Sequence, residues 1–344
     1  MSEAAASAPA VVGALPSGAS PWTLARRRLL RNRIALAMLG VFVAIVLLCL
    51  AAPIYAHDIA HTDPFRSNLN GTTVVNGKRV QVMPPATSGL AIGTIPIGPT
   101  WDPHHYLLGA DNQGRDVAAR LLYGGRNSLL IGFFAALITC LAGTLIGVVA
   151  GFFGGITDGV ISRVLEIVWA FPVYLFAICL SIILLNQDFV LGPIRIGSGS
   201  LVLPIAIIGI VYIPYVARPV RGEVLSLRRR EFVEAAIGLG ASRTRLLRKD
   251  ILPNVVTTVI VLFPLVMAIA MLTEAALSFL SIGVQPPDAT WGTIIQDGND
   301  LIRTRPTVAL APGLAIALTV LALNVLGDGI RDALDPRAKV RGPR

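Results

Sequence analysis

The sequence predicts an all-α membrane protein whose chain crosses the bilayer six times. Its 344 residues have a mean hydropathy of +0.71. Of these residues 54% are hydrophobic and only 14% are charged, whereas a soluble protein usually carries about 25% charged residues. Six apolar segments have, or approach, the roughly 20 residues that a helix needs to span a bilayer. None of them contains Asp, Glu, Lys or Arg.

The predicted spans share their length and their lack of charge. They are residues 34–52, 128–153, 167–185, 201–217, 255–273 and 308–326. In lipid each span must satisfy its own backbone hydrogen bonds, so helix is the expected conformation. Prolines recur within the spans, and in membrane bundles neighbouring groups compensate for the backbone hydrogen bond that a proline removes.

The distribution of Lys and Arg predicts the orientation in the membrane. With a cytoplasmic N-terminus, 20 of the 29 basic residues fall in short inside segments, above all residues 218–253. The positive-inside rule then places both termini in the cytoplasm. The first span is longer than the 7–15-residue core of a cleaved signal peptide, so we expect it to remain. The basic residues that give the net charge of +9 flank apolar runs. No nucleic-acid-binding motif accompanies them, which argues against nucleic acid as a partner.

The segments between the spans complete the predicted organisation. Residues 1–33 form a cytoplasmic tail, of which residues 1–20 are rich in Ala, Ser, Pro and Gly and read as disordered. Residues 53–127 form an extracytoplasmic loop, residues 218–253 the largest cytoplasmic loop, and residues 327–344 a cytoplasmic C-terminal tail.

The cytoplasmic loop contains a helix–Gly–helix pattern. Apolar residues follow the spacing i, i+3, i+4 and i+7, which predicts one face of a short helix; they are Phe232, Ala235, Ala236 and Leu239. Gly240 stands where a left-handed C-terminal cap belongs. Ser242 can cap a second helix, and Pro253 opens the next span. The pattern alone fits two roles equally: a docking unit for a partner, or a basic loop that only fixes topology.

The same loop resembles the "EAA" loop of ABC importer permeases. Glu234-Ala235-Ala236, Gly240 and Leu252-Pro253 match that motif in spacing, although Asp250 replaces its usual isoleucine. In that family the loop holds the coupling helix, which docks in a groove of the ATPase subunit. The resemblance therefore implies a coupling role for Glu231, Phe232, Glu234, Ala235, Ala236, Leu239, Gly240, Leu252 and Pro253.

Three further stretches resemble one branch of that family, the dipeptide/oligopeptide/nickel permeases, and its second (C-type) permease. They are Gly109–Gly124 before the second span, Glu274–Gly292 after the fifth, and Asn324–Arg337 at the end of the sixth. The resemblance implies the type I ABC importer permease fold, with a peripheral first span and a five-helix core over residues 128–326. It also implies a sister permease, two ATP-binding subunits and an extracytoplasmic solute-binding protein as partners.

The resemblance implies peptides as cargo, with nickel or another small solute as the alternative. An ion-coupled secondary carrier is the rival of another class, and the absence of charge in the six cores argues against it. We expect no catalytic residue and no cofactor in this chain. Its one Gly-Lys pair, Gly77-Lys78, is followed by Arg79 and so does not complete a phosphate-binding loop. ATP and Mg²⁺ are therefore expected on the partner subunits.

Glu274 and the histidines are the remaining candidates. A carboxylate at the outer end of the fifth span is costly unless it is paired. Glu274 therefore either positions the loop that begins at Ser278 or takes part in gating or lining the path. His57 and His61 have the i, i+4 spacing of metal ligands on a helix, but no cysteine accompanies them, and we predict no metal site. The three cysteines lie in apolar runs and are expected to be packing residues.

Overall fold

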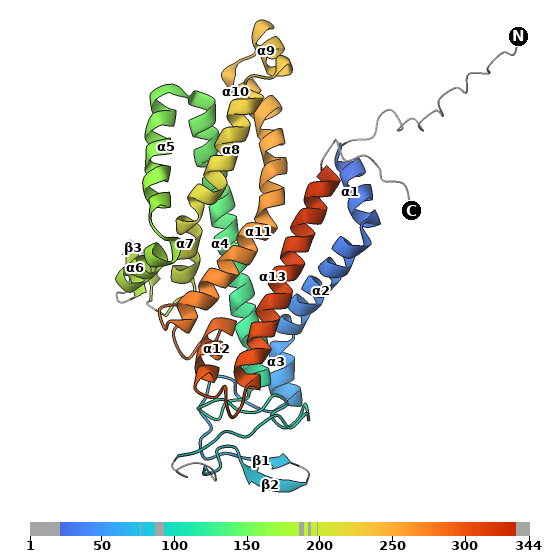
Figure 1. Ribbon diagram of the computed structural model, residues 1–344, viewed down its shortest axis with the longest axis vertical. Helices are drawn as coiled ribbons and strands as arrows, with labels where there is room; N and C mark the ends of the chain where they lie inside the picture. The colour runs from blue at the N-terminus through green and yellow to red at the C-terminus, as the bar shows by residue number, and fades with distance from the viewer. Residues whose placement is uncertain are drawn as a thin grey trace, which may run out of the picture.

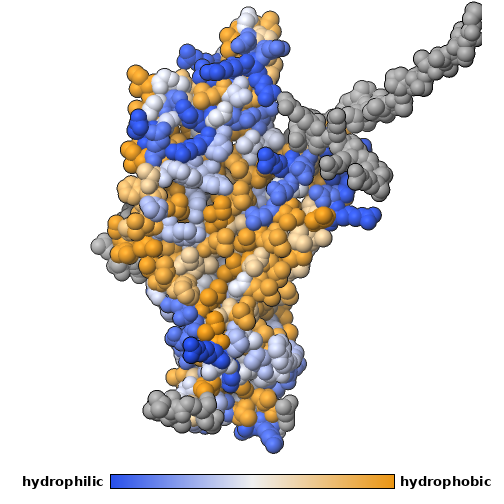
Figure 2. Space-filling view, in the orientation of Figure 1, coloured by the Kyte–Doolittle hydropathy of each residue, from blue (hydrophilic) through white to orange (hydrophobic). Residues whose placement is uncertain are grey.

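A computed structural model of the chain describes residues 21–75, 77–86, 93–185, 189–191, 194–197 and 199–334. Long helices run from one end of the molecule to the other (Figure 1). Hydrophobic residues form a broad band across the middle of the visible face, between hydrophilic residues at the two ends (Figure 2). Within these described ranges, four helices are long and apolar enough to cross a membrane, or six spans if each of two bent pairs is one crossing. The second way of counting gives the predicted six.

Two short helices mark the ends of the bundle. Helix α9 (Glu231–Gly238) lies at one end and α12 (Trp291–Asn299) lies toward the other. We call these the α9 end and the α12 end. The α12 end also carries a hairpin of β1 (Thr72–Val75) and β2 (Lys78–Gln81), in which Thr72 pairs with Gln81.

The N-terminal helices lie along one side of the bundle (Figure 1). Helix α1 (Pro21–Arg31) forms where a tail was expected, and the predicted disordered residues 1–20 lie outside the described residues. Asn32 caps α2 (Arg33–Leu50) by accepting a hydrogen bond from the Ala35 amide at 3.1 Å. Helix α2 buries only Ala35 and Cys49, and it is followed by α3 (Ala52–Ile54) and a π-helical turn, η1 (Tyr55–Ile59).

The second span begins earlier than predicted, as α4 (Val117–Phe153). Asp116 starts it, because its Oδ1 accepts hydrogen bonds from the amides of Ala118 and Ala119 at 2.8 and 3.2 Å. Such a cap satisfies amides that have no partner within the helix. The extra turns at the start of α4 therefore lie within the segment that we had expected to be loop.

Glycines let α4 approach α8 (Ile213–Leu227) closely. Gly143, Gly147 and Gly151 recur every fourth residue on one face of α4, and all three are buried. A Cβ at Gly147 would lie 2.5 Å from the Ala217 carbonyl oxygen. Small residues at this spacing are how membrane helices bring their backbones together.

The third span is not the single helix expected over residues 167–185. Helix α5 (Gly155–Ala170) and α6 (Val173–Leu185) are bent by 90° relative to each other. Phe171 between them is extended, with ψ of 137°, as the residue before a proline prefers. The fourth span also bends, by 41°, between α7 (Val202–Val211) and α8. A second hairpin, β3 (Phe189–Leu191) and β4 (Ile194–Ile196), lies between α6 and α7.

The last two spans are longer than predicted. α10 (Arg243–Arg245), a π-helical segment η2 (Leu246–Ile251) and α11 (Leu252–Phe279) follow one another without interruption. Helix α12 then precedes α13 (Thr307–Leu334), which packs against α11, α12 and α2. The main core lies where α4, α8 and α11 meet, with Val216, Val220 and Met271 among its buried side chains.

Candidate functional site

Helix α9 ends in the turn that the sequence predicts. Gly240 has a φ of +80°, its amide donates to the Ile237 carbonyl at 2.9 Å, and the Ala241 amide donates to the Ala236 carbonyl at 3.0 Å. These two bonds define a Schellman cap, which favours glycine at the left-handed position. Glu231 and Glu234 lie in the first turn of α9, where negative charge stabilises the helix dipole.

Most of α9 faces outward. Phe232 and Leu239 are 44% and 89% exposed, and the residues between them at Glu234 and Ala235 are also exposed. The side chain that anchors α9 is Val233, which is 2% exposed and was not among the predicted residues. The sequence signal for Val233 was its apolar side chain three residues before Ala236, a spacing that places both residues on one face of a helix. The apolar surface of α9 is thus open to a partner.

The connection from α9 to the bundle is direct. Ser242 accepts a hydrogen bond from the Arg245 amide at 3.4 Å and starts the helical run that continues through η2 into α11. Pro253 lies in the first turn of α11, as predicted, and Leu252 beside it is 38% exposed. A cavity of about 400 Å³ separates α9 from the end of α4. Its apolar walls include Phe152, Phe153, Val233, Ile237, Leu246 and Ile251.

Glu274 is held in a buried hydrogen-bond network near the α12 end. Its Oε1 accepts a hydrogen bond from Ser278 Oγ at 2.7 Å, and its Oε2 accepts one from Ser128 Oγ of α4 at 3.1 Å. Ser128 Oγ accepts the Trp291 amide of α12 at 3.1 Å, and Ser278 Oγ accepts the Val284 amide at 3.2 Å. Glu274 is only 1% exposed, and these bonds connect α4, α11 and α12 around its carboxylate.

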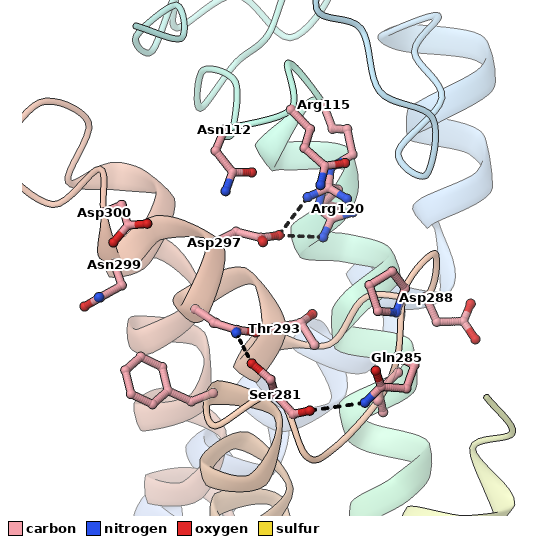
Figure 3. A pocket seen from close by; sticks show the side chains of 15 residues that line it. Asn112, Arg115, Arg120, Ser281, Gln285, Asp288, Thr293, Asp297, Asn299 and Asp300 are labelled. Carbon is pink, nitrogen blue, oxygen red and sulfur yellow. Dashed lines mark hydrogen bonds and ion pairs between the residues drawn. The ribbon is translucent and has the colours of Figure 1, made fainter. Parts of the chain in front are cut away.

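Charged residues form a second network at the α12 end (Figure 3). Arg115 donates to Asp111 at 2.6 Å and to Asp297 of α12 at 2.8 Å. Arg120 of α4 donates to Asp297 at 3.0 Å, and its Nε lies 3.3 Å from Asp111. Asp111, Arg115 and Arg120 are almost fully buried, and 22% of the Asp297 side chain is exposed. The sequence motif before α4 therefore fixes α12 to the start of α4.

A polar pocket of about 570 Å³ opens beside this network, and Figure 3 shows its lining. Asp288, Asn299 and Asp300 contribute to its walls together with Arg115 and Asp297. Asp297 was missed from sequence, although a lone acidic residue in an otherwise uncharged helix was a signal for it.

The histidines do not gather into a metal site. Among the described residues, no three His, Cys, Asp or Glu side chains lie together as a metal ion would require. His57 lies in η1 with its Nδ1 2.5 Å from the neighbouring Asp58 carboxylate, and His104 Nδ1 lies 3.0 Å from the Ile59 carbonyl oxygen. His61 has a positive φ of 50° and lies after the helical turn.

Comparisons with known proteins agree with this architecture. Residues 143–340 match the family described as binding-protein-dependent transport system inner membrane component, and residues 20–70 match the N-terminal transmembrane domain of oligopeptide transport permease C. The chain is 35% identical over 321 residues to the dipeptide transport system permease protein DppC of Alkalihalophilus pseudofirmus, covering 93% of this chain and 91% of that protein. It is also 35% identical over 320 residues to the oligopeptide transport system permease protein OppC of Haemophilus influenzae, covering 93% and 90%.

A solved structure shares the fold. An inward-facing structure of the MetNI methionine ABC transporter aligns with a TM-score of 0.52 at 17% identity, covering 63% of this chain and 96% of that one. The predicted type I ABC importer permease fold is therefore confirmed, and a secondary carrier is not favoured. With its bent spans, its α9 loop and these relatives, the chain belongs to the binding-protein-dependent transport system inner membrane components, the permease subunits of ABC importers.

Proposed function

We propose that this permease forms, with a related sister permease, the translocation path of an ATP-driven importer of peptides. The observation that carries the proposal is α9, a short helix with an exposed apolar face, held by one buried side chain and ended by a Schellman cap. The similarity to dipeptide and oligopeptide permeases along more than nine tenths of the chain supports peptides as the cargo.

In this proposal one of two ATP-binding subunits binds α9, and the pair of subunits supplies the energy. ATP and Mg²⁺ are held on those subunits, and the present chain performs no covalent chemistry. Phe232, Ala235 and Leu239 provide exposed apolar surface for the contact. Glu231, Glu234, Ala236, Gly240, Leu252 and Pro253 shape the helix, its turn and its connection to α11.

The proposed cycle is alternating access. ATP binds more tightly to the conformation in which the ATP-binding subunits are closed, and this differential affinity shifts the permease toward its outward-facing state. A solute-binding protein delivers the peptide to the α12 end, and the reset after hydrolysis releases it at the α9 end. Glu274 serves here as the hydrogen-bond centre that keeps α4, α11 and α12 in register.

The α9 end is proposed to be cytoplasmic, together with both termini, in a bacterial inner membrane. Exposed basic residues at Arg229, Arg230 and Arg243 lie around α9, which is the side that the positive-inside rule assigns to the cytoplasm. At the α12 end, by contrast, Arg115 and Arg120 are neutralised by Asp111 and Asp297.

Site-specific cross-linking in the assembled transporter tests the proposal. Cys179 is exposed whereas Cys49 and Cys140 are buried, so Cys179→Ser provides the background for Ala235→Cys. We expect Ala235→Cys to cross-link to an ATP-binding subunit. Leu141→Cys, at an exposed position of α4, should not. Reconstituted vesicles should take up peptide only when ATP is present on the side of the membrane that carries the ATP-binding subunits. Peptide uptake that follows a proton gradient without ATP would overturn the proposal.

A further inference from the structure

An apolar groove runs between α2, α4 and α11 on the side of the bundle that carries the N-terminal helix. It is an open cavity of about 380 Å³, within the usual size of small-ligand pockets of about 300–1,000 Å³. Phe42 and Val46 of α2, Leu130 and Phe133 of α4 and Met267 of α11 line it. Leu130 and Phe133 are 43% and 42% exposed, so the groove opens outward.

One charged side chain enters this apolar lining. Arg126 of α4 is the only ionisable residue of the groove apart from Cys49. Its guanidinium lies 5.6 Å from the centre of the Tyr123 ring, and no carboxylate among the described residues forms an ion pair with it. Arg115, just before α4, and Arg120, in its first turn, are by contrast both paired with Asp297. An arginine against apolar surface without a carboxylate calls for an anion from outside the chain.

The position of Arg126 identifies where that anion would come from. It is the tenth residue of α4, about 14 Å along the helix from Val117. A side chain at the neighbouring Gly125 would strike the sulfur of Cys49, so Arg126 lies level with the last turn of α2, which ends at Leu50. Phe42, Val46 and Phe133 continue from that level toward the middle of the bundle. The cation therefore stands at one end of an apolar groove that follows the helices.

We infer that the groove binds a membrane phospholipid, with the phosphate on Arg126 and an acyl chain along Val46, Leu130 and Phe133. A phospholipid carries one anionic phosphate at the head of an apolar chain, which is the order of charge and apolar surface in the groove. The planar guanidinium can donate two parallel hydrogen bonds to phosphate oxygens. The apolar wall contributes through van der Waals packing against the acyl chain. The lipid would fill the space between α2 and the helices of the core.

Retention of lipid by the purified transporter tests this inference. The complete complex is solubilised, exchanged into detergent with added phosphatidylglycerol, and washed. The phospholipid retained per complex is then measured by mass spectrometry. Arg126→Gln should retain about fivefold less, the effect of one basic residue near a phosphate surface. Arg126→Lys should retain an intermediate amount, because it keeps the charge without the planar fork. Arg303→Gln, an exposed arginine at the α12 end, is the matched control and should behave as wild type.

A second pair of variants tests the apolar part independently of Arg126. Leu130→Trp narrows the groove and should reduce lipid retention. Leu141→Trp, at a 65% exposed position of the same helix, should leave it unchanged. Equal retention by wild type and Arg126→Gln, or equal losses in the two tryptophan variants, would overturn the inference. So would an efficient cross-link from Val46→Cys to the sister permease, because the groove would then be a protein interface.

Discussion

Asp297 Oδ2 accepts a hydrogen bond from Arg115 Nη2 at 2.8 Å, although 182 residues separate the two in the sequence. The same oxygen accepts a second hydrogen bond from Arg120 at 3.0 Å. One carboxylate thereby joins α12 to the loop before α4 and to the first turn of α4 itself. The geometry of this junction depends on both signs of charge, since removing either leaves buried charge without a partner.

Loss of the Asp297 carboxylate should destabilise this junction. Asp297→Ala leaves Arg115 and Arg120 sharing Asp111 alone, and breaking a buried ion pair in this way costs about 3 kcal/mol. The apparent unfolding midpoint of the purified complex should fall by about 5 °C or more. Asp300→Ala, at an exposed position on the same pocket, is the control and should change it little. Equal midpoints for the two variants would contradict the junction.

Asp116 should tolerate asparagine but not alanine. Asn retains an oxygen that accepts the Ala118 amide, whereas Ala leaves the start of α4 uncapped at a cost of about 1 kcal/mol. Burial raises the pKa of the Asp116 carboxyl above its ordinary value of 3.8. Its contribution to stability is therefore greatest below that value and declines as the pH rises through the raised pKa. Thermal unfolding from acid to neutral pH should show a smaller decline in Asp116→Asn, and an unchanged decline would count against the assignment.

Substitutions in the α9 loop should uncouple ATP hydrolysis from uptake. Gly240→Val forces a β-branched residue into φ of +80°, although a Cβ there meets nothing within 4 Å, so the change acts on the turn and not on packing. Glu234→Lys reverses an exposed charge in the first turn of α9. Both variants should insert into the membrane normally while uptake falls at least about tenfold, through loss of roughly 1.4 kcal/mol of coupling.

Matched variants outside the loop provide the controls for this test. Gly222→Ala changes a glycine of α8 that also has nothing within 4 Å of its Cβ, and Glu223→Lys reverses a charge beside it. Both should keep wild-type coupling between ATPase activity and uptake in reconstituted vesicles. Substrate-stimulated ATPase and transport at wild-type levels in Gly240→Val or Glu234→Lys would refute the coupling role.

Glu274 distinguishes a positioning role from a role in the path. Glu274→Ala removes the acceptor for the Ser128 and Ser278 hydroxyls and leaves a cavity. The free energy of unfolding of the complex should therefore fall by about 2–3 kcal/mol, and its yield should fall as well. Glu274→Gln keeps one oxygen acceptor, and because hydroxyls can reverse their direction it should retain most stability and transport. A stable Glu274→Gln complex that has lost transport would show instead that the charge serves the path.

Local chemistry made the α9 loop predictable. Each predicted feature of this loop depends only on residues close together in the sequence, and each is found in the structure. These features are the short helix that begins at Glu231, the left-handed Gly240, the cap at Ser242 and the first-turn Pro253. The approximate places of the apolar segments were likewise predictable because exclusion of charge is a local property of a segment. The arrangement of these segments as a type I ABC importer permease was predicted from the family resemblance.

Longer-range relationships were not readable from single segments. The 90° bend between α5 and α6 depends on Phe171 and Pro172 within an apolar run that composition treats as uniform. The early start of α4 depends on buried pairing of Arg120 with Asp297, which makes a charged residue acceptable within the helix. Val233 became the anchor of α9 only because the folded chain brings the α9 end of the bundle beneath it.

The continuous helix from Arg243 to Phe279 has 37 residues, which corresponds to about 55 Å. It begins just after the cap of α9 and carries Glu274 near its other end, while Pro264 interrupts its backbone hydrogen bonds close to the midpoint, where bending is easiest. Bending at Pro264 would let the half of the helix next to α9 tilt while the half that carries Glu274 stays held by its hydrogen bond to Ser128 of α4. A displacement that begins at α9 would then be absorbed at the proline, so the two halves of one span can move by different amounts.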